Sequence, residues 1–148
     1  MAHAVGIAIR TTKGCPHLRA TVVDVSTGQL VSTFEFQASE GEVADQVHQI
    51  AQDLASELTA LDPIAVLIRE VGFARKAGMT AAVKTRIRAE GACVGVARAV
   101  TSKVAVMETN GIAHLLGVSG STVDNAGTAL TSGKWVESAT AAVAAARM

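Results

Sequence analysis

The densest group of chargeable side chains in the sequence is basic. Six of the 13 Lys and Arg residues fall within twenty positions that hold one acid, Glu70. They are Arg69, Arg75, Lys76, Lys84, Arg86 and Arg88. Lys84 and Arg88 are four residues apart, so they share one face of a helix. Such a basic strip can neutralise backbone phosphates without reading base sequence, although a solvated helix face has the same pattern.

Residue types that serve metal or stacking chemistry are sparse. Cys15 and Cys93 lie in different segments without zinc-ligand spacing, and the four histidines include no pair four residues apart. Aromatic residues make up 3% of the chain, which argues against a platform for stacking single-stranded bases. The net charge of zero excludes a globally basic nucleic-acid binder but not a local basic patch. No cofactor is expected.

The elements that would position these residues begin with three strands. Apolar and small residues alternate over 5–9, and β-branched runs follow at 18–25 and 30–36. Turn residues separate the runs at 13–16 and 26–28, as in an antiparallel meander.

The hydrophobic spacing then changes to that of helices and buried strands. Ser39 and Glu42 form a candidate capping box for a long helix that ends at Asp62 and Pro63. Residues 64–68 form a continuous apolar run, typical of a strand buried on both faces. A second helix is expected from Thr80 to Val100, followed by a strand at 104–107.

Two short helical segments, near 112–116 and 122–130, and a last helix from about Lys134 to the end complete the order β-β-β-α-β-α-β-α. This order predicts an α/β fold with a mixed five-stranded sheet and helices on both faces. At 148 residues and 49% hydrophobic content, the chain is expected to be one domain, 1–148. No signal peptide or membrane span is apparent, so a cytoplasmic protein with reduced cysteines is expected.

Four segments, taken in order, resemble the RuvC Holliday-junction resolvase family of the RNase H-like superfamily. Gly6-Ile7-Ala8 resembles its first-strand Gly-Ile-Asp, and residues 66–97 resemble its fourth strand, loop and following helix. Residues 107–110 with 118–120 resemble its Glu-Tyr-Thr-Pro segment and the Val-x-Gly after it. Residues 136–146 resemble its C-terminal helix. The resemblance covers nearly the whole chain.

The resemblance implies a site for two divalent metals, held by four carboxylates. Carried over, these positions are Ala8, Arg69, Glu137 and Thr140, so only Glu137 is a carboxylate. Glu70 and Asp24 are candidates for relocated ligands, although one residue along a strand reverses the side chain's direction. Near the fifth strand, where the family places lysines, the chain has His114, Leu115 and Leu116.

Three hypotheses follow. The first is a catalytically inactive RuvC-like homodimer that binds branched or duplex DNA through the basic strip. The second is an interaction or scaffolding module with a protein partner. The third is a nuclease dependent on Mg²⁺ or Mn²⁺, with carboxylates around Glu70, Glu137 and Asp24.

Overall fold

Three antiparallel strands open the chain and two parallel strands complete the sheet. A computed structural model describes residues 1–70 and 78–148. The strands are β1 (His3–Thr12), β2 (Cys15–Asp24), β3 (Leu30–Gln37), β4 (Ala65–Arg69) and β5 (Val104–Met107). The α-helices are α1 (Val43–Leu61), α2 (Ala81–Val100), α3 (Thr109–Leu116), α4 (Asn125–Thr128) and α5 (Val136–Ala145). Two 3₁₀ turns, η1 (Gly120–Thr122) and η2 (Gly133–Trp135), precede α4 and α5.

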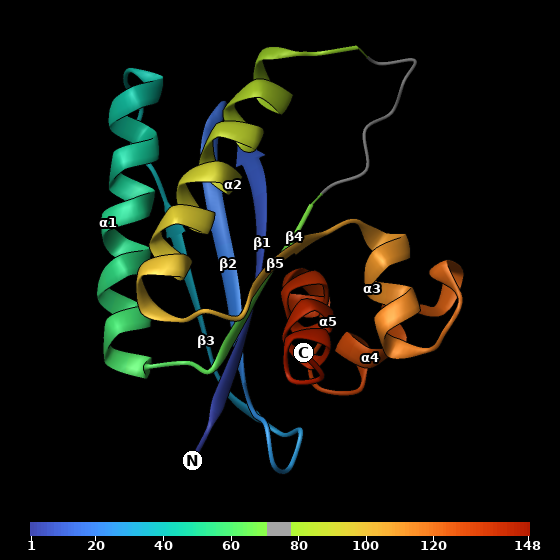
Figure 1. Cartoon of the computed structure of the whole chain (residues 1–148). Helices are drawn as coiled ribbons and strands as arrows, with labels where there is room; N and C mark the ends of the chain where they lie inside the picture. The colour runs from blue at the N-terminus through green and yellow to red at the C-terminus, as the bar shows by residue number, and fades with distance from the viewer. Residues whose placement is uncertain (71–77) are drawn as a thin grey trace.

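The strands lie in the order β3-β2-β1-β4-β5. β1, β2 and β3 pair antiparallel, and β4 pairs parallel with β1 and with β5. Helices α1 and α2 cover one face, and α5 with α3 and α4 lies on the other (Figure 1). The predicted fold class, a mixed five-stranded sheet with helices on both faces, is confirmed.

The protein has two hydrophobic cores, one on each face of the sheet, because side chains alternate between the two faces along each strand. Val5, Ile7 and Ile9 of β1 pack with buried residues of α1 and α2. Ala4 of β1 and Leu67 of β4 point to the other face and pack with α3 and α5. The residues between them on β1, Gly6 and Ala8, therefore lie on the α5 face.

Helix α5 lies very close to β1 because both surfaces are small. A Cβ built on Gly6 would come within 2.0 Å of the Ala142 nitrogen and 2.2 Å of the Ser138 oxygen. The Ser138 and Thr21 hydroxyls, 2.7 Å apart, join the helix to β2. This backbone contact sets how far α5 stands from the sheet.

Several element boundaries differ from the predictions. The capping box is wrong: α1 begins at Val43, its N-cap Glu42 makes no side-chain capping bond, and Ser39 instead bonds to Gln46 and Gln49. The helix predicted at 122–130 is helical only in α4, after the η1 turn. By contrast, Thr80 caps α2 through the Val83 N–H, and Asp62 ends α1 in a left-handed conformation (φ 46°).

Among the strands of residues 1–70 and 78–148, none pairs with the outer edge of β3, which ends the sheet. Leu30 and Val31 at its start are 40% and 42% exposed. Within the described part of the chain, no helix is long and apolar enough to cross a bilayer.

We expect Gly6→Ala to destabilise the fold by about 3 kcal/mol, because the added methyl meets helix backbone that cannot rotate away. Gly91→Ala is the matched control. Gly91 lies in α2, and apart from its chain neighbours and the adjacent backbone of its own helix, no atom of the described residues lies within 4 Å of the place that a Cβ would take. Alanine should therefore add about 0.5–1 kcal/mol of helix stability. Urea denaturation of both variants measures the difference, and equal stabilities would contradict this account.

Candidate functional site

One row of residues crosses the sheet beneath the start of α5. The strand registers place Glu35, Arg19, Ala8, Arg69 and Met107 opposite one another, from β3 to β5. All five point to the α5 face, because their neighbours along each strand face α1 and α2. Ala8 therefore lies between two arginines, at the place where the family resemblance implies a metal-binding aspartate.

Arg69 is held in an internal network. Its side chain is 8% exposed, and Nη1 donates to Asp124 Oδ1 at 2.5 Å. Its Nη2 donates to Thr109 Oγ1 at 3.2 Å. Thr140 Oγ1 donates to the same Asp124 oxygen at 3.2 Å and accepts the Gly127 N–H at 3.1 Å. Arg69 and Thr140 are two of the four positions at which the family resemblance implies metal ligands. Both thus belong to one hydrogen-bonded network that links β4, α3, α4 and α5.

Gly127 of α4 packs closely against α5 beside Thr140. A Cβ on Gly127 would come within 2.5 Å of Thr140 Oγ1 and 2.2 Å of the Val136 oxygen. The Arg69 guanidinium, with Thr140 in a smaller role, holds the pKa of the Asp124 carboxyl below its usual value. Asp124 therefore stays charged and serves as the counter-ion of a buried arginine.

Glu137, the one family carboxylate in place, is bound to a cation. Arg10 lies two residues beyond Ala8 on β1, and its Nη2 lies 2.5 Å from Glu137 Oε1. The Arg10 and Glu137 side chains are 55% and 28% exposed, so the pair lies at the rim of the site.

The remaining arginine of the row, Arg19, lies in a third charged group. Glu35 Oε2 is 3.5 Å from Arg19 Nε and 2.9 Å from His17 Nε2, and Glu35 Oε1 accepts from Lys134 Nζ at 2.6 Å. The Lys134 hydrogen bond, followed by that of His17, lowers the pKa of Glu35. Three arginines around Ala8 are thus each matched to a carboxylate.

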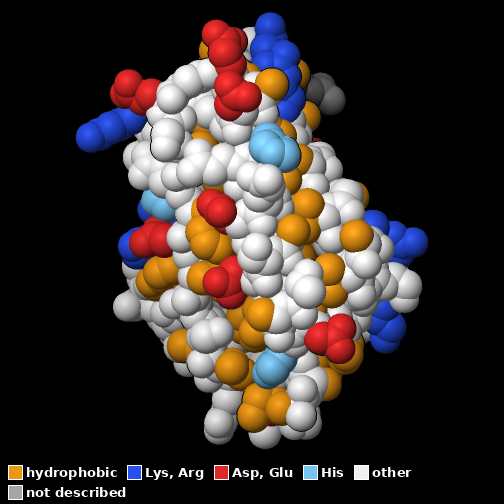
Figure 2. Space-filling model, turned by 90° about the vertical axis from the view of Figure 1, so that its left-hand side faces the viewer, with side chains coloured by type: hydrophobic (Ala, Val, Ile, Leu, Met, Phe, Trp, Pro, Cys, Tyr) orange, Lys and Arg blue, Asp and Glu red, His pale blue; other side chains and the backbone are white. Residues whose placement is uncertain are grey.

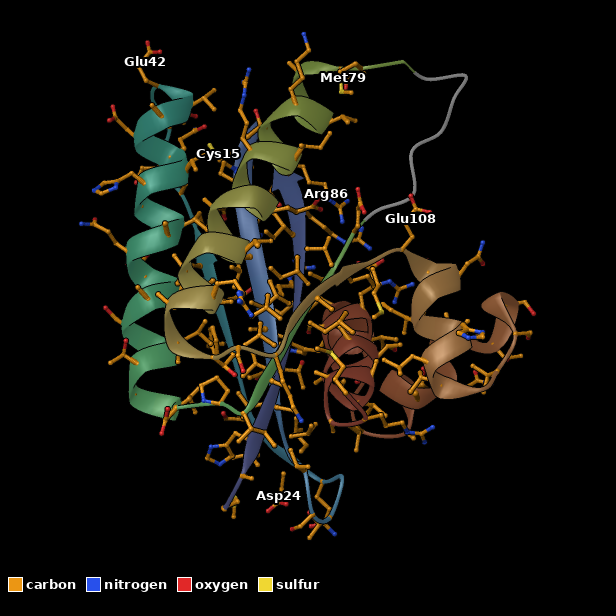
Figure 3. All side chains as sticks on the ribbon, in the orientation of Figure 1. Cys15, Asp24, Glu42, Met79, Arg86 and Glu108 are labelled. Atoms are coloured by element: carbon orange, nitrogen blue, oxygen red, sulfur yellow. The ribbon has the colours of Figure 1, made fainter. Side chains whose placement is uncertain are left out.

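Neither candidate for a relocated ligand joins the site. Asp24 is paired with His3 at the other end of β1, five residues from Ala8, or about 16 Å. Figure 3 shows it at the opposite end of the sheet from Arg86 and Glu108. Its carboxylate accepts bonds from Ser26 and Thr27, which lower its pKa. Asp24 therefore lies away from Ala8, at the other end of β1.

Glu70 comes directly after β4. Its backbone N–H donates to the Met107 oxygen, so the pairing with β5 continues to this residue. One step after Arg69, its side chain leaves the strand toward the opposite face. In the parts of the chain that the structure describes, no three His, Cys, Asp or Glu residues are grouped to hold a metal ion.

The structure does not bring the predicted basic strip together on one surface. Arg69 is internal, and Arg86 is 14% exposed and bonded through Nε to Glu90 Oε1 at 3.0 Å. Lys84 and Arg88 of α2 are exposed, as their spacing predicted. The other two members, Arg75 and Lys76, lie outside the described residues.

Two basic residues that sequence reasoning missed lie beside the start of α2. Thr11 Oγ1 donates to the Ala82 oxygen at 3.2 Å, which brings the end of β1 to the first turn of α2. Arg10 on β1 and Lys13, directly after it, flank this contact, and both are exposed. The face covered by α1, in contrast, shows Lys and Arg only at its margins (Figure 2), consistent with the lack of either residue in 20–68.

The fold, with its meander, parallel β4 and β5 and helices on both faces, defines an RNase H-like α/β domain. More particularly, it is the fold of RuvC. The Thermus thermophilus RuvC structure matches with a TM-score of 0.75 and 18% identity, covering 98% of this chain and 93% of that one. T. thermophilus RuvC in complex with a Holliday junction substrate matches with a TM-score of 0.73 and 18% identity, covering 99% and 94%. No protein-family model matches the sequence, and a search of curated proteins finds no match.

We expect Asp124→Ala to cost about 3 kcal/mol of stability, because it leaves a buried guanidinium without its counter-ion. Arg69→Met should cost less, about 1–2 kcal/mol, since Asp124 is 47% exposed and water can solvate it. The rim pair gives the control: Arg10→Met should cost about 0.5 kcal/mol. Chemical denaturation of the three variants tests this order, and a larger loss for Arg69→Met than for Asp124→Ala would contradict it.

Proposed function

We propose that the chain, as one domain over 1–148, is a RuvC-like protein that binds the nucleic-acid backbone without cutting it. The observation that carries the proposal is the environment of Arg69. A guanidinium bound to Asp124 and Thr109 stands where a nuclease of this fold would place a metal-binding glutamate.

Metal-assisted cleavage needs oxygen ligands for two cations. Ala8 offers no oxygen in its side chain, Arg69 contributes a positive charge, and Thr140 already bonds to Asp124. Glu137 is the remaining carboxylate, and Arg10 occupies it. A divalent ion entering this site would have to displace two arginines that already satisfy the carboxylates.

The backbone contact is assigned to the exposed cations near the start of α2. Lys84 and Arg88 lie on its outer face, and Arg10 and Lys13 lie across the Thr11–Ala82 contact. These residues come from two segments far apart in sequence. They offer point charges and donors for phosphates but no exposed aromatic ring for bases.

A protein partner is the second candidate, supported by the apolar part of α2. Ile87 is 47% exposed beside Gly91 and Gly95, which leave a flat helix surface. The same surface suits pairing with a second copy, so a homodimer remains our expectation. A cytoplasmic location also remains a prediction; Cys15 and Cys93 are both free and buried.

We expect the wild-type chain to bind neither Mn²⁺ nor Mg²⁺ at this site and to leave branched DNA intact. Electron paramagnetic resonance titration with Mn²⁺ and a junction-cleavage assay measure the two properties. A variant with Ala8→Asp, Arg69→Glu and Thr140→Asp, which restores four carboxylates, is the positive control for metal binding. Stoichiometric Mn²⁺ binding by the wild type, or cleavage that is lost in Glu137→Ala, would establish the nuclease alternative instead.

We expect duplex and junction DNA to bind at low salt and to dissociate steeply as salt rises, because binding releases the counter-ions condensed on the phosphates. Lys84→Gln/Arg88→Gln should flatten the plot of log K against log salt by about 2, or about 0.9 for each lost contact. Arg98→Gln/Lys103→Gln removes two exposed charges from the other end of α2 and should leave the slope nearly unchanged. Failure of every DNA to bind at low salt would favour the protein-partner alternative.

A further inference from the structure

The pair formed by Arg10 and Glu137 has the composition of a phosphate site already filled by a carboxylate. Arg10 presents its guanidinium at the rim of the sheet, where the side chain is 55% exposed. Glu137 accepts from Nη2 at 2.5 Å through one oxygen only. A guanidinium that donates to a carboxylate through one nitrogen keeps other N–H groups for a second anion. Phosphate matches the planar arrangement of these N–H donors.

Further basic residues lie near the pair, and one of them, Arg86, is itself paired with Glu90. Arg86 lies behind the Arg10–Glu137 pair on α2, and its Nη2 is buried without a hydrogen-bond partner among the residues that the structure describes. Burial lowers the pKa of Arg86 and the hydrogen bond to Glu90 raises it, while Glu137 raises it and Arg10 lowers it to a smaller extent. Lys13 and Lys84 flank the same end on the outside.

The bond between Arg10 and Glu137 is weak enough to exchange. Ion pairs at a solvent-accessible rim are weak, because water competes for the charged groups. The partners of the deeper arginine, Arg69, are different: that guanidinium is 8% exposed and held by Asp124 and Thr109. Of the two, Arg10 is the one that an incoming anion can reach.

We propose that Arg10 and Glu137 form a phosphate site in which the Glu137 carboxylate occupies Arg10 until a phosphate group displaces it. The inference rests on the proposed function, since the phosphate is that of a nucleic-acid backbone. It gives Glu137 a role opposite to that of a metal ligand: the carboxylate competes with the phosphate and weakens binding. Free inorganic phosphate offers the same chemistry, and the experiment separates the two sources.

The test compares Glu137→Gln with Glu108→Gln in the full chain, by fluorescence anisotropy of a labelled duplex over a range of salt. Glu108 precedes α3 at the same end of the sheet (Figure 3), is exposed, and its replacement changes the net charge equally. Glu137→Gln should tighten binding about two- to fivefold and steepen the salt slope by about 0.9, since one more phosphate contact forms. Glu108→Gln should leave the slope unchanged, and Arg10→Gln added to Glu137→Gln should remove the gain. Circular dichroism checks that the variants fold.

Equal effects of Glu137→Gln and Glu108→Gln, or a gain that persists without Arg10, would overturn the site while leaving DNA binding itself intact. If no variant binds DNA at low salt, the proposed function fails, and inorganic phosphate then decides the site. Saturable shifts of the Arg10 side-chain NMR signal in Glu137→Gln, larger than in wild type and absent with matched chloride, would assign the site to free phosphate. No shift would reject it.

Discussion

The contact between β1 and α5 is the constraint on which the rest of this structure depends. A helix that stands at backbone distance from a strand needs glycine on the strand and small side chains on the helix, and Gly6 with the alanines of α5 meets that need. The contact carries the start of α5 to the end of β1. Glu137 therefore reaches Arg10, and Thr140 reaches Asp124. The packing of α5 on β1 thus positions α5 against both the Arg10–Glu137 pair and the Arg69–Asp124 pair.

The site combines charges of both signs. A cluster of carboxylates in a buried place repels itself unless cations are bound. Here arginines stand beside carboxylates: Arg69 with Asp124, Arg10 with Glu137 and Arg19 with Glu35. Each of these cations is part of the chain itself. The buried pair of Arg69 and Asp124, with Thr109, also joins α3 and α4 to the sheet. In a metal site, the ion and its ligands would together make such a connection.

The sequence is sufficient to predict the element order and the two covered faces of the sheet, because hydrophobic period and a few turn residues determine these features. The pairing of Ala8 with Arg69 comes from the structure. It does not reveal Asp124 as the partner of Arg69, since the two lie 55 residues apart and nothing local to Asp124 marks it. Arg86 is grouped with Lys84 and Arg88 by its place in the sequence, but the 3.6-residue period turns it inward toward Glu90. Arg10 and Lys13 escape sequence reasoning because only the tertiary contact between Thr11 and Ala82 brings them to α2.

The unpaired border of β3 has a consequence for the handling of this protein. Edge strands are commonly protected from intermolecular pairing by lysine, proline or a covering segment. β3 reads Leu-Val-Ser-Thr-Phe-Glu-Phe-Gln, and its one charge, Glu35, is bound to Lys134 on the face of the sheet rather than directed outward. Concentrated solutions are therefore most vulnerable to aggregation through this strand, and a lysine at Val31 or Thr33 is the conservative means of improving colloidal behaviour without touching the site.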